Sequence, residues 1–208
     1  VKQIKTTAKE SMALPRHPVY GSFSPLQHGI RVAQLDPLWN NGNYYDQEKQ
    51  PTESLALAMQ MMNVAAFHAG FFERVYPRET MKDQENLESV TGQTTFEKAL
   101  NAVVMQSVPY TDLNHWIYTC RMCINYDVSR PYGGDLDKAL SRIRAKVLAV
   151  PCRQDALHPW EFITWVTDRI NTLGGNAESY ILVSDYGHMA GILRTDLFAE
   201  KVREFLDN

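Results

Sequence analysis

With 208 residues, the chain is long enough for one sizeable domain, or for a core that carries an insertion. Its 44% hydrophobic and 22% charged residues are ordinary for a globular protein, and no uninterrupted apolar stretch approaches the length of a membrane span. The formal net charge of −3, without a long basic run, argues against a nucleic-acid partner.

The first 25 residues carry the weakest pattern. Residues 1–8 could form a strand, and three prolines between residues 15 and 25 indicate a loop. The chain begins with neither a methionine nor a signal peptide, so we expect it to continue from a longer protein.

The middle of the chain, residues 26–142, is predicted to be helical, because apolar residues recur there at helical spacing. The expected helices cover residues 26–35, 51–72, 111–126 and 135–143. A further helix opens at Thr94, which stands three residues before Glu97 in the spacing of a capping box. The residues before it, 78–93, are polar and are expected to form a connection.

The end of the chain, residues 143–208, alternates between strands and helices. Residues 146–151 and 179–183 are short apolar runs typical of buried strands, and residues 160–173 between them carry one apolar helical face. A last helix follows. This alternation indicates a parallel sheet with right-handed crossovers, and chemistry in such sheets gathers beyond the carboxyl ends of the strands.

Asp155 and His188 each follow one of these strands. An acid and a histidine so placed are two thirds of a nucleophile–His–acid system, in which the acid fixes the histidine tautomer and the histidine takes the proton of the nucleophile. Their order in the chain, acid before histidine, is the order of the α/β-hydrolases. Spacing alone gives equal support to a structural alternative, in which Asp155 caps the start of the next helix and His188 is a loop residue.

Two other patterns could indicate a metal site. Asp155 with His158, and Asp185 with His188, both have the spacing D-x-x-H at strand ends, and carboxylate and imidazole ligands suit Zn or Fe. Cys120 and Cys123 form a single C-x-x-C inside a predicted helix, where packing is the better explanation. The odd count of three cysteines fits a reducing compartment, and we expect a cytoplasmic protein.

Four stretches together resemble the homoserine O-acetyltransferase family of α/β-hydrolase-fold acyltransferases. Residues 36–45 read D-P-L-W-N-N-G-N-Y-Y, similar to the D-P-x-W-x-x-G-x-Y-Y entry to the family's helical lid. Residues 55–58 (L-A-L-A) and 110–128 resemble two lid helices, and residues 154–159 (Q-D-A-L-H-P) and 186–188 (Y-G-H) resemble the family's acid and histidine loops. The resemblance covers nearly the whole chain.

The resemblance implies a partial α/β-hydrolase fold with a helical lid inserted before the last two parallel strands. Residues 1–25 would hold the last strand and loop before the lid, residues 26–142 the lid, and residues 143–208 the end of the hydrolase core. It also implies an acyl-CoA donor, a small alcohol or ester substrate, no bound cofactor and, as one arrangement, a homodimer through the lid. Asp155 would be the acid and His188 the general base.

Further residues follow from the resemblance by position. Tyr44, Tyr45, Trp116 and Tyr118 are candidate walls of the substrate entrance, with core packing as the alternative for each and the favoured one for Trp116. His158 stands where the family has an aromatic residue, so packing explains it and we predict no metal. Met189 follows the histidine where the homoserine enzymes have Asp, so the expected acceptor is not homoserine.

The nucleophile is the missing part of this comparison. The family carries it in a G-x-S-x-G elbow upstream of the lid, and the chain contains no such motif. Ser11 lacks the flanking glycines and lies too close to the Asp36-Pro37 motif. The leading hypothesis is therefore the C-terminal portion of an acyltransferase; the alternatives are an esterase, or a non-catalytic truncated pseudoenzyme or interaction domain.

Overall fold

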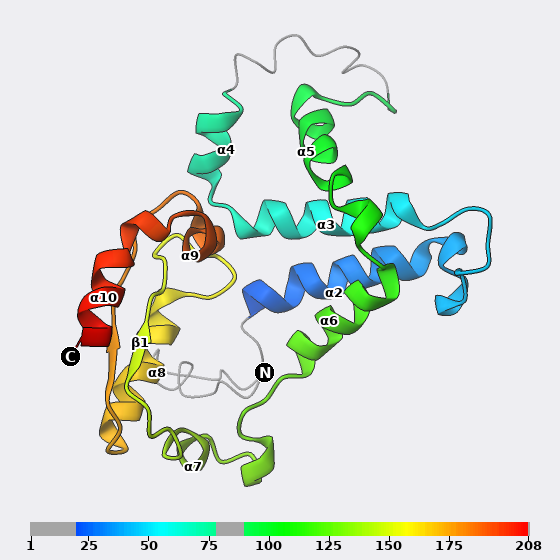
Figure 1. The fold of residues 1–208 in the computed structure, drawn as a ribbon. Coiled ribbons are helices and arrows are strands. Elements are labelled where there is room, and N and C mark those ends of the chain that lie inside the picture. The colour runs from blue at the N-terminus through cyan, green and yellow to red at the C-terminus, as the bar shows by residue number, and fades with distance from the viewer. Residues whose placement is uncertain (1–19, 78–89, 208) are drawn as a thin grey trace, which may run out of the picture.

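A computed structural model describes residues 20–77 and 90–207, with the backbone alone for residues 20–24. The strand expected within residues 1–8 and most of the polar connection fall outside this part. Figure 1 shows a helical block, built on α2, α3 and α6, beside a smaller part that holds the strands and the C-terminal helices. The described chain is therefore mostly helical, with two strands at its end.

The helical block takes its shape from four packed helices and their turns. Its elements are α2 (Tyr20–Leu35), η1 (Pro37–Gly42), α3 (Thr52–Ala66), α4 (Ala69–Val75), α5 (Thr95–Met105), η3 (Val108–Tyr110), α6 (Leu113–Asn125), η4 (Arg130–Tyr132) and α7 (Leu136–Leu140). One apolar core joins α2, α3, α5 and α6, and Ile30, Leu113 and Val104 are its largest fully buried side chains. Cys120 is buried in this core, as packing predicted, whereas Cys123 is exposed.

Side-chain caps fix where several of these helices begin. Thr94 and Glu97 form the predicted capping box at the start of α5. Asp112 accepts from the backbone N–H of His115 at 2.7 Å and so caps α6. Asp135 caps α7 in the same way.

Two predicted helix boundaries in this block were wrong. The first helix begins at Tyr20 rather than at residue 26. The long helix predicted over residues 51–72 is broken at Phe67 and His68, whose backbones are extended, and the two halves α3 and α4 meet at 105°. The break is tertiary in origin, because the His68 backbone N–H leaves the helix to donate to Asp185 O at 3.1 Å.

Two short parallel strands carry the C-terminal part. Its elements are β1 (Val147–Ala149), α8 (Trp160–Thr172), β2 (Ala177–Ser179), η5 (Gly187–Met189), α9 (Ala190–Leu193), η6 (Thr195–Leu197) and α10 (Ala199–Asp207). β1 and β2 are hydrogen-bonded neighbours, with Leu148 opposite Glu178. The predicted parallel pairing is therefore present, with α8 as its crossover.

The second strand lies earlier than predicted. β2 covers residues 177–179 instead of 179–183, because the side chain of Asn171 at the end of α8 bonds both backbone groups of Ala177. The ladder is interrupted after β2, because Pro151 has no N–H to donate to it. Backbone pairing resumes beyond this point as an isolated bridge between Cys152 and Leu182. The predicted single last helix was also wrong: it is divided into α9, η6 and α10.

No single helix among the described residues is long and apolar enough to cross a membrane. Only α3 and α4 taken together pass on length and composition, across their 105° bend. Leu55, Ala56 and Ala58 of α3 are buried within the folded chain.

Candidate functional site

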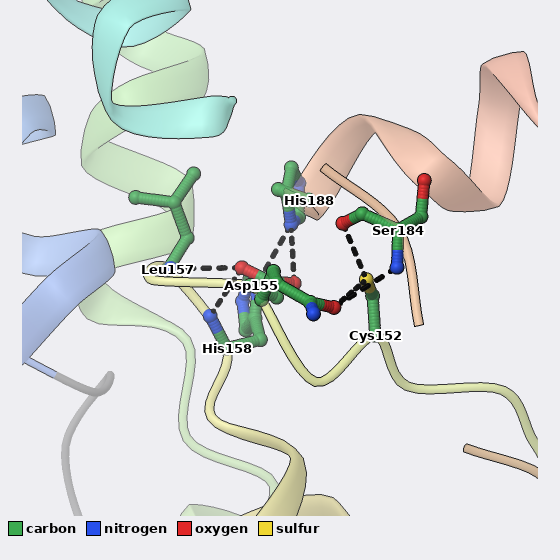
Figure 2. Close-up of polar contacts among 7 residues, drawn as sticks. Cys152, Asp155, Leu157, His158, Ser184 and His188 are labelled. Atoms are coloured by element: carbon green, nitrogen blue, oxygen red, sulfur yellow. Dashed lines mark hydrogen bonds and ion pairs between the residues drawn. The ribbon is translucent and has the colours of Figure 1, made fainter. Parts of the chain in front are cut away.

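The two loops that follow β1 and β2 meet at one edge of the sheet. Because the strands are parallel neighbours, their carboxyl ends lie side by side, and the loop after β1 brings Asp155 against His188 from η5. His188 Nδ1 lies 2.9 Å from Asp155 Oδ2 (Figure 2). The predicted proximity of this acid and this histidine is therefore present in the structure.

Asp155 uses its two oxygens for different purposes. Oδ1 accepts from the backbone N–H groups of Leu157 at 2.8 Å and His158 at 2.9 Å, which fixes the turn, while Oδ2 faces His188. Asp155 thus fixes the turn of its own loop with one oxygen and pairs with His188 through the other, so the two alternatives from the sequence do not exclude each other. Burial of this side chain raises its pKa, but the hydrogen bonds from His188 and from the His158 backbone outweigh burial, so the pKa lies below its usual range and the group is a carboxylate at neutral pH.

A second layer of polar contacts joins the two loops behind this pair. Gln154 Oε1 accepts from the backbone N–H of Ser184 at 2.9 Å. The thiol of Cys152 donates to Ser184 O at 3.4 Å, as Figure 2 shows. These bonds hold the loop before His188 at a fixed distance from the loop of Asp155.

Gly187 determines how closely the histidine loop can pack. Its φ is +55°, and a Cβ atom there would lie 2.9 Å from Ala66 O, 3.1 Å from His68 N and 3.2 Å from Gln154 O. Only glycine accepts both this conformation and this crowding. The glycine of the Y-G-H sequence thus lets the histidine loop pack directly against the break between α3 and α4.

His158, a candidate metal ligand by its D-x-x-H spacing for which packing was the favoured explanation, lies directly against His188. Its Nδ1 lies 3.2 Å from His188 Nδ1 and 4.0 Å from Asp155 Oδ2, and the two imidazole rings stack with centroids 4.9 Å apart. Burial lowers the pKa of His158, and His188 lowers it further. The D-x-x-H spacing was the available signal. Asp185 of the other D-x-x-H pair is instead bonded to Arg74 at 2.8 Å.

A cavity of about 300 Å³ opens beside the pair. Asp155, His158 and His188 provide its polar groups, and Val150, Pro151 and Ile163 provide apolar wall. The cavity is large enough for a small substrate group next to His188. Met189 follows His188 in η5 and is half-buried.

The aromatic residues predicted to line the entrance are not brought to this cavity. Tyr44 and Tyr45 border another cavity of about 300 Å³ at the start of α3, whereas Gly187 packs at its end. A 15-residue helix spans roughly 22 Å, so the two cavities are far apart. Trp116 packs against the helical core and Gly29, and Tyr118 is exposed.

No family model matches the chain. The chain is 28% identical over 172 residues to a homoserine O-acetyltransferase from Geobacter metallireducens, a match that covers 83% of this chain and 45% of that protein. It is 27% identical over 190 residues to a serine O-succinyltransferase from Stenotrophomonas maltophilia, covering 88% of this chain and 51% of that protein.

A solved structure gives the same relationship. The crystal structure of a homoserine O-acetyltransferase from Bacillus anthracis matches with a TM-score of 0.84 and 36% sequence identity, over 93% of this chain and 51% of that one. The chain thus spans about half the length of the relatives it matches.

Proposed function

We propose, from the premise that the chain belongs to the homoserine O-acetyltransferase-like family of α/β-hydrolases, that it supplies the acid and the general base of an acyl-transfer enzyme. The predicted fold class is confirmed: the chain is a partial α/β-hydrolase fold, mostly helical with two parallel strands, and matches the C-terminal half of such structures. The observation that carries the proposal is the 2.9 Å contact between His188 and Asp155 at the carboxyl edge of the sheet.

The proton positions follow from the chemistry of the two groups. A carboxylate has no hydrogen to give, so His188 Nδ1–H is the donor and Asp155 Oδ2 the acceptor. The neutral imidazole then carries its lone pair on Nε2, which is the atom that can take a proton from a hydroxyl nucleophile. When it does so, Asp155 stabilises the resulting imidazolium.

The nucleophile itself is proposed to lie outside these 208 residues, which contain no G-x-S-x-G. Its hydroxyl would attack the acyl carbon of the donor and pass its proton to His188 Nε2, and the donor's thiolate would leave with that proton. The acyl group would then pass to an alcohol that His188 deprotonates in the same way. An acyl-CoA donor is proposed from the family.

Met189 supports an acceptor other than homoserine. The homoserine enzymes carry Asp after the catalytic histidine, and the Met189 thioether has no charge with which to hold an ammonium group. A less charged alcohol suits this position better. Water as acceptor, giving ester hydrolysis, is the second candidate on the same observation. Contact of Tyr44 or Tyr45 with substrate would involve the cavity at the far end of α3 rather than the reacting atoms.

Three organisational proposals remain from the resemblance. Residues 1–25, 26–142 and 143–208 are proposed as the pre-lid segment, the lid and the end of the hydrolase core. A homodimer through the lid and a cytoplasmic location are proposed with them.

The test uses the complete polypeptide that contains this chain, expressed from its natural coding sequence. Acyl transfer is followed by thiol release from acetyl-CoA with L-homoserine and apolar alcohols as acceptors, and hydrolysis is followed with p-nitrophenyl acetate. We expect turnover that His188→Gln abolishes and that His115→Gln, at an exposed position of α6, leaves in place. Turnover that survives His188→Gln would refute the proposal. A folded protein with no acyl chemistry would favour a non-catalytic interaction domain, and efficient transfer to L-homoserine would refute the acceptor assignment.

A further inference from the structure

Three side chains at this site converge through atoms that can all bind a metal ion. Asp155 Oδ2, His158 Nδ1 and His188 Nδ1 form a triangle with sides of 2.9, 3.2 and 4.0 Å. Among the described residues, these three are the one group of histidine, cysteine and acidic side chains whose ligand atoms meet in this way.

The size of the triangle suits a divalent transition-metal ion. A zinc ion with ligands at 2.0–2.1 Å in tetrahedral geometry has neighbouring ligands about 3.3 Å apart. The three observed separations differ from this value by about 0.1 to 0.7 Å, so side-chain movements of less than about 1 Å bring all three atoms to one ion. The cavity beside the site provides room for a water molecule as fourth ligand.

The two imidazole nitrogens of His158 and His188 that face each other at 3.2 Å cannot both carry a hydrogen directed at the other. His188 Nδ1 donates its hydrogen to Asp155, so the facing His158 Nδ1 can only accept a share of that same hydrogen. The lone pair of His158 Nδ1 and the Asp155 carboxylate oxygen thus share a single hydrogen, the one on His188 Nδ1. A doubly charged ion at the centre would interact favourably with all three atoms at once.

We propose that Asp155, His158 and His188 form a binding site for a divalent transition-metal ion such as Zn²⁺, with both histidines coordinating through Nδ1. The exposure of the His158 side chain, 48%, leaves a route by which the ion can enter. The buried carboxylate, 9% exposed, supplies the negative charge.

Metal binding has a defined consequence for the general base, which rests on the proposed function. A neutral imidazole that coordinates through Nδ1 carries its hydrogen on Nε2. The hydrogen of His188 therefore moves from Nδ1 to Nε2 without any change in the number of protons. Nε2–H has no lone pair with which to accept a proton, so the metal-bound form is inactive as a base.

The test measures binding rather than activity, so it can fail while the proposed function stands. Zn²⁺ is titrated calorimetrically into the 208-residue protein with Cys123→Ser as background, because that thiol is exposed. We expect one ion per chain, and His158→Phe, which keeps a ring in place, should weaken binding at least about tenfold. His115→Phe serves as the matched control at a histidine outside the site.

Three results would overturn the inference. These are absence of stoichiometric binding, equal affinity in His158→Phe, and equal weakening in His115→Phe, which would mean adventitious binding to surface histidines. X-ray absorption of the zinc complex provides a test that needs no variant at the site. Two imidazole ligands and no sulfur support the site, and a sulfur ligand overturns it.

Discussion

His188 Nδ1 and Asp155 Oδ2 lie 2.9 Å apart although 33 residues separate them in the chain. If this bond selects the productive tautomer of His188, Asp155→Asn in the complete polypeptide should lower turnover roughly 10⁴-fold, as the equivalent change does in a serine protease. Steady-state kinetics of acyl transfer measure the effect. Asp137→Asn, in α7 and paired with Arg169, is the matched control outside the site and should cost less than about tenfold. A loss below tenfold in Asp155→Asn would make the carboxylate dispensable.

The 208-residue chain by itself should show neither acyl transfer nor ester hydrolysis. The nucleophile and the oxyanion donors supply most of the rate enhancement in such enzymes, and the chain has no motif for them. Thiol release from acetyl-CoA and hydrolysis of p-nitrophenyl acetate are the assays. Robust turnover that vanishes in His188→Ala would reveal an overlooked nucleophile, and Ser11, outside the described residues, would be examined first.

Gly187→Ala should destabilise the protein more than Gly133→Ala. Both glycines have positive φ, but a Cβ at Gly187 meets Ala66 O at 2.9 Å, whereas at Gly133 it meets no described atom within 4 Å. We expect a loss of about 1 kcal/mol in unfolding free energy for Gly133→Ala and roughly 2–4 kcal/mol for Gly187→Ala. Urea denaturation measures both. Equal losses would mean that the loop of His188 can move away from Ala66 to accommodate a Cβ atom without a further loss of unfolding free energy.

Tyr44→Phe should cost more stability than Tyr45→Phe. Tyr44 is buried and its hydroxyl donates to Asp112 at 2.5 Å, while Tyr45 is exposed and lies 3.3 Å from the other oxygen of Asp112. Loss of a hydrogen bond to a charged group costs about 1.5–3 kcal/mol, so this range is expected for Tyr44→Phe and less than about 1 kcal/mol for Tyr45→Phe. The reverse order in urea denaturation would show that the buried hydroxyl is not a structural contact.

Part of the decrease in unfolding free energy at acid pH should come from protonation of Asp112. Burial raises the pKa of this carboxyl, but hydrogen bonds from Tyr44 and the His115 backbone outweigh burial and bring it below the usual 3.8. The Asp112 carboxyl of the unfolded chain, with a pKa of about 3.9, therefore binds a proton more tightly than that of the folded chain. The stabilisation is fully present above pH 4 to 5 and is lost as the pH falls through the lower pKa of the folded state.

The measurement for this prediction is the unfolding free energy between pH 7 and pH 3. Asp112→Asn should show a smaller decrease with acid than the unchanged chain, because Asn does not titrate. Parallel curves for the two proteins would assign the acid sensitivity to other carboxyl groups.

The sequence predicted those parts of the site that depend on strand order. Asp155 and His188 could be paired because each follows a strand, and parallel neighbours end at the same edge. The contact of His158 with His188 could not be predicted, because it depends on how the residues after Asp155 turn back toward the second loop. Tyr44 was a candidate wall residue, but its partner Asp112 lies 68 residues away, and that pairing buries it at the other end of α3.

For the fold as well, features set by neighbouring residues in the sequence were predicted, whereas features set by contacts with distant residues were missed. The capping box at Thr94 was recognisable because all its groups lie within four residues. The break at His68 was missed because its cause, Asp185, belongs to the opposite end of the chain. The early start of β2 was missed because the Asn171 side chain, rather than the apolar pattern of the strand, selects it.

The break between α3 and α4 rests directly on the loop of His188. The His68 backbone bonds Asp185 O, Gly187 fits against Ala66 O, and Arg74 of α4 bonds the Asp185 side chain. The break between α3 and α4 and the loop of His188 therefore form one connected structural unit. The end of α3 cannot move independently of that loop. A change that tilts α3 is therefore expected to displace His188 as well, because the two segments share these contacts.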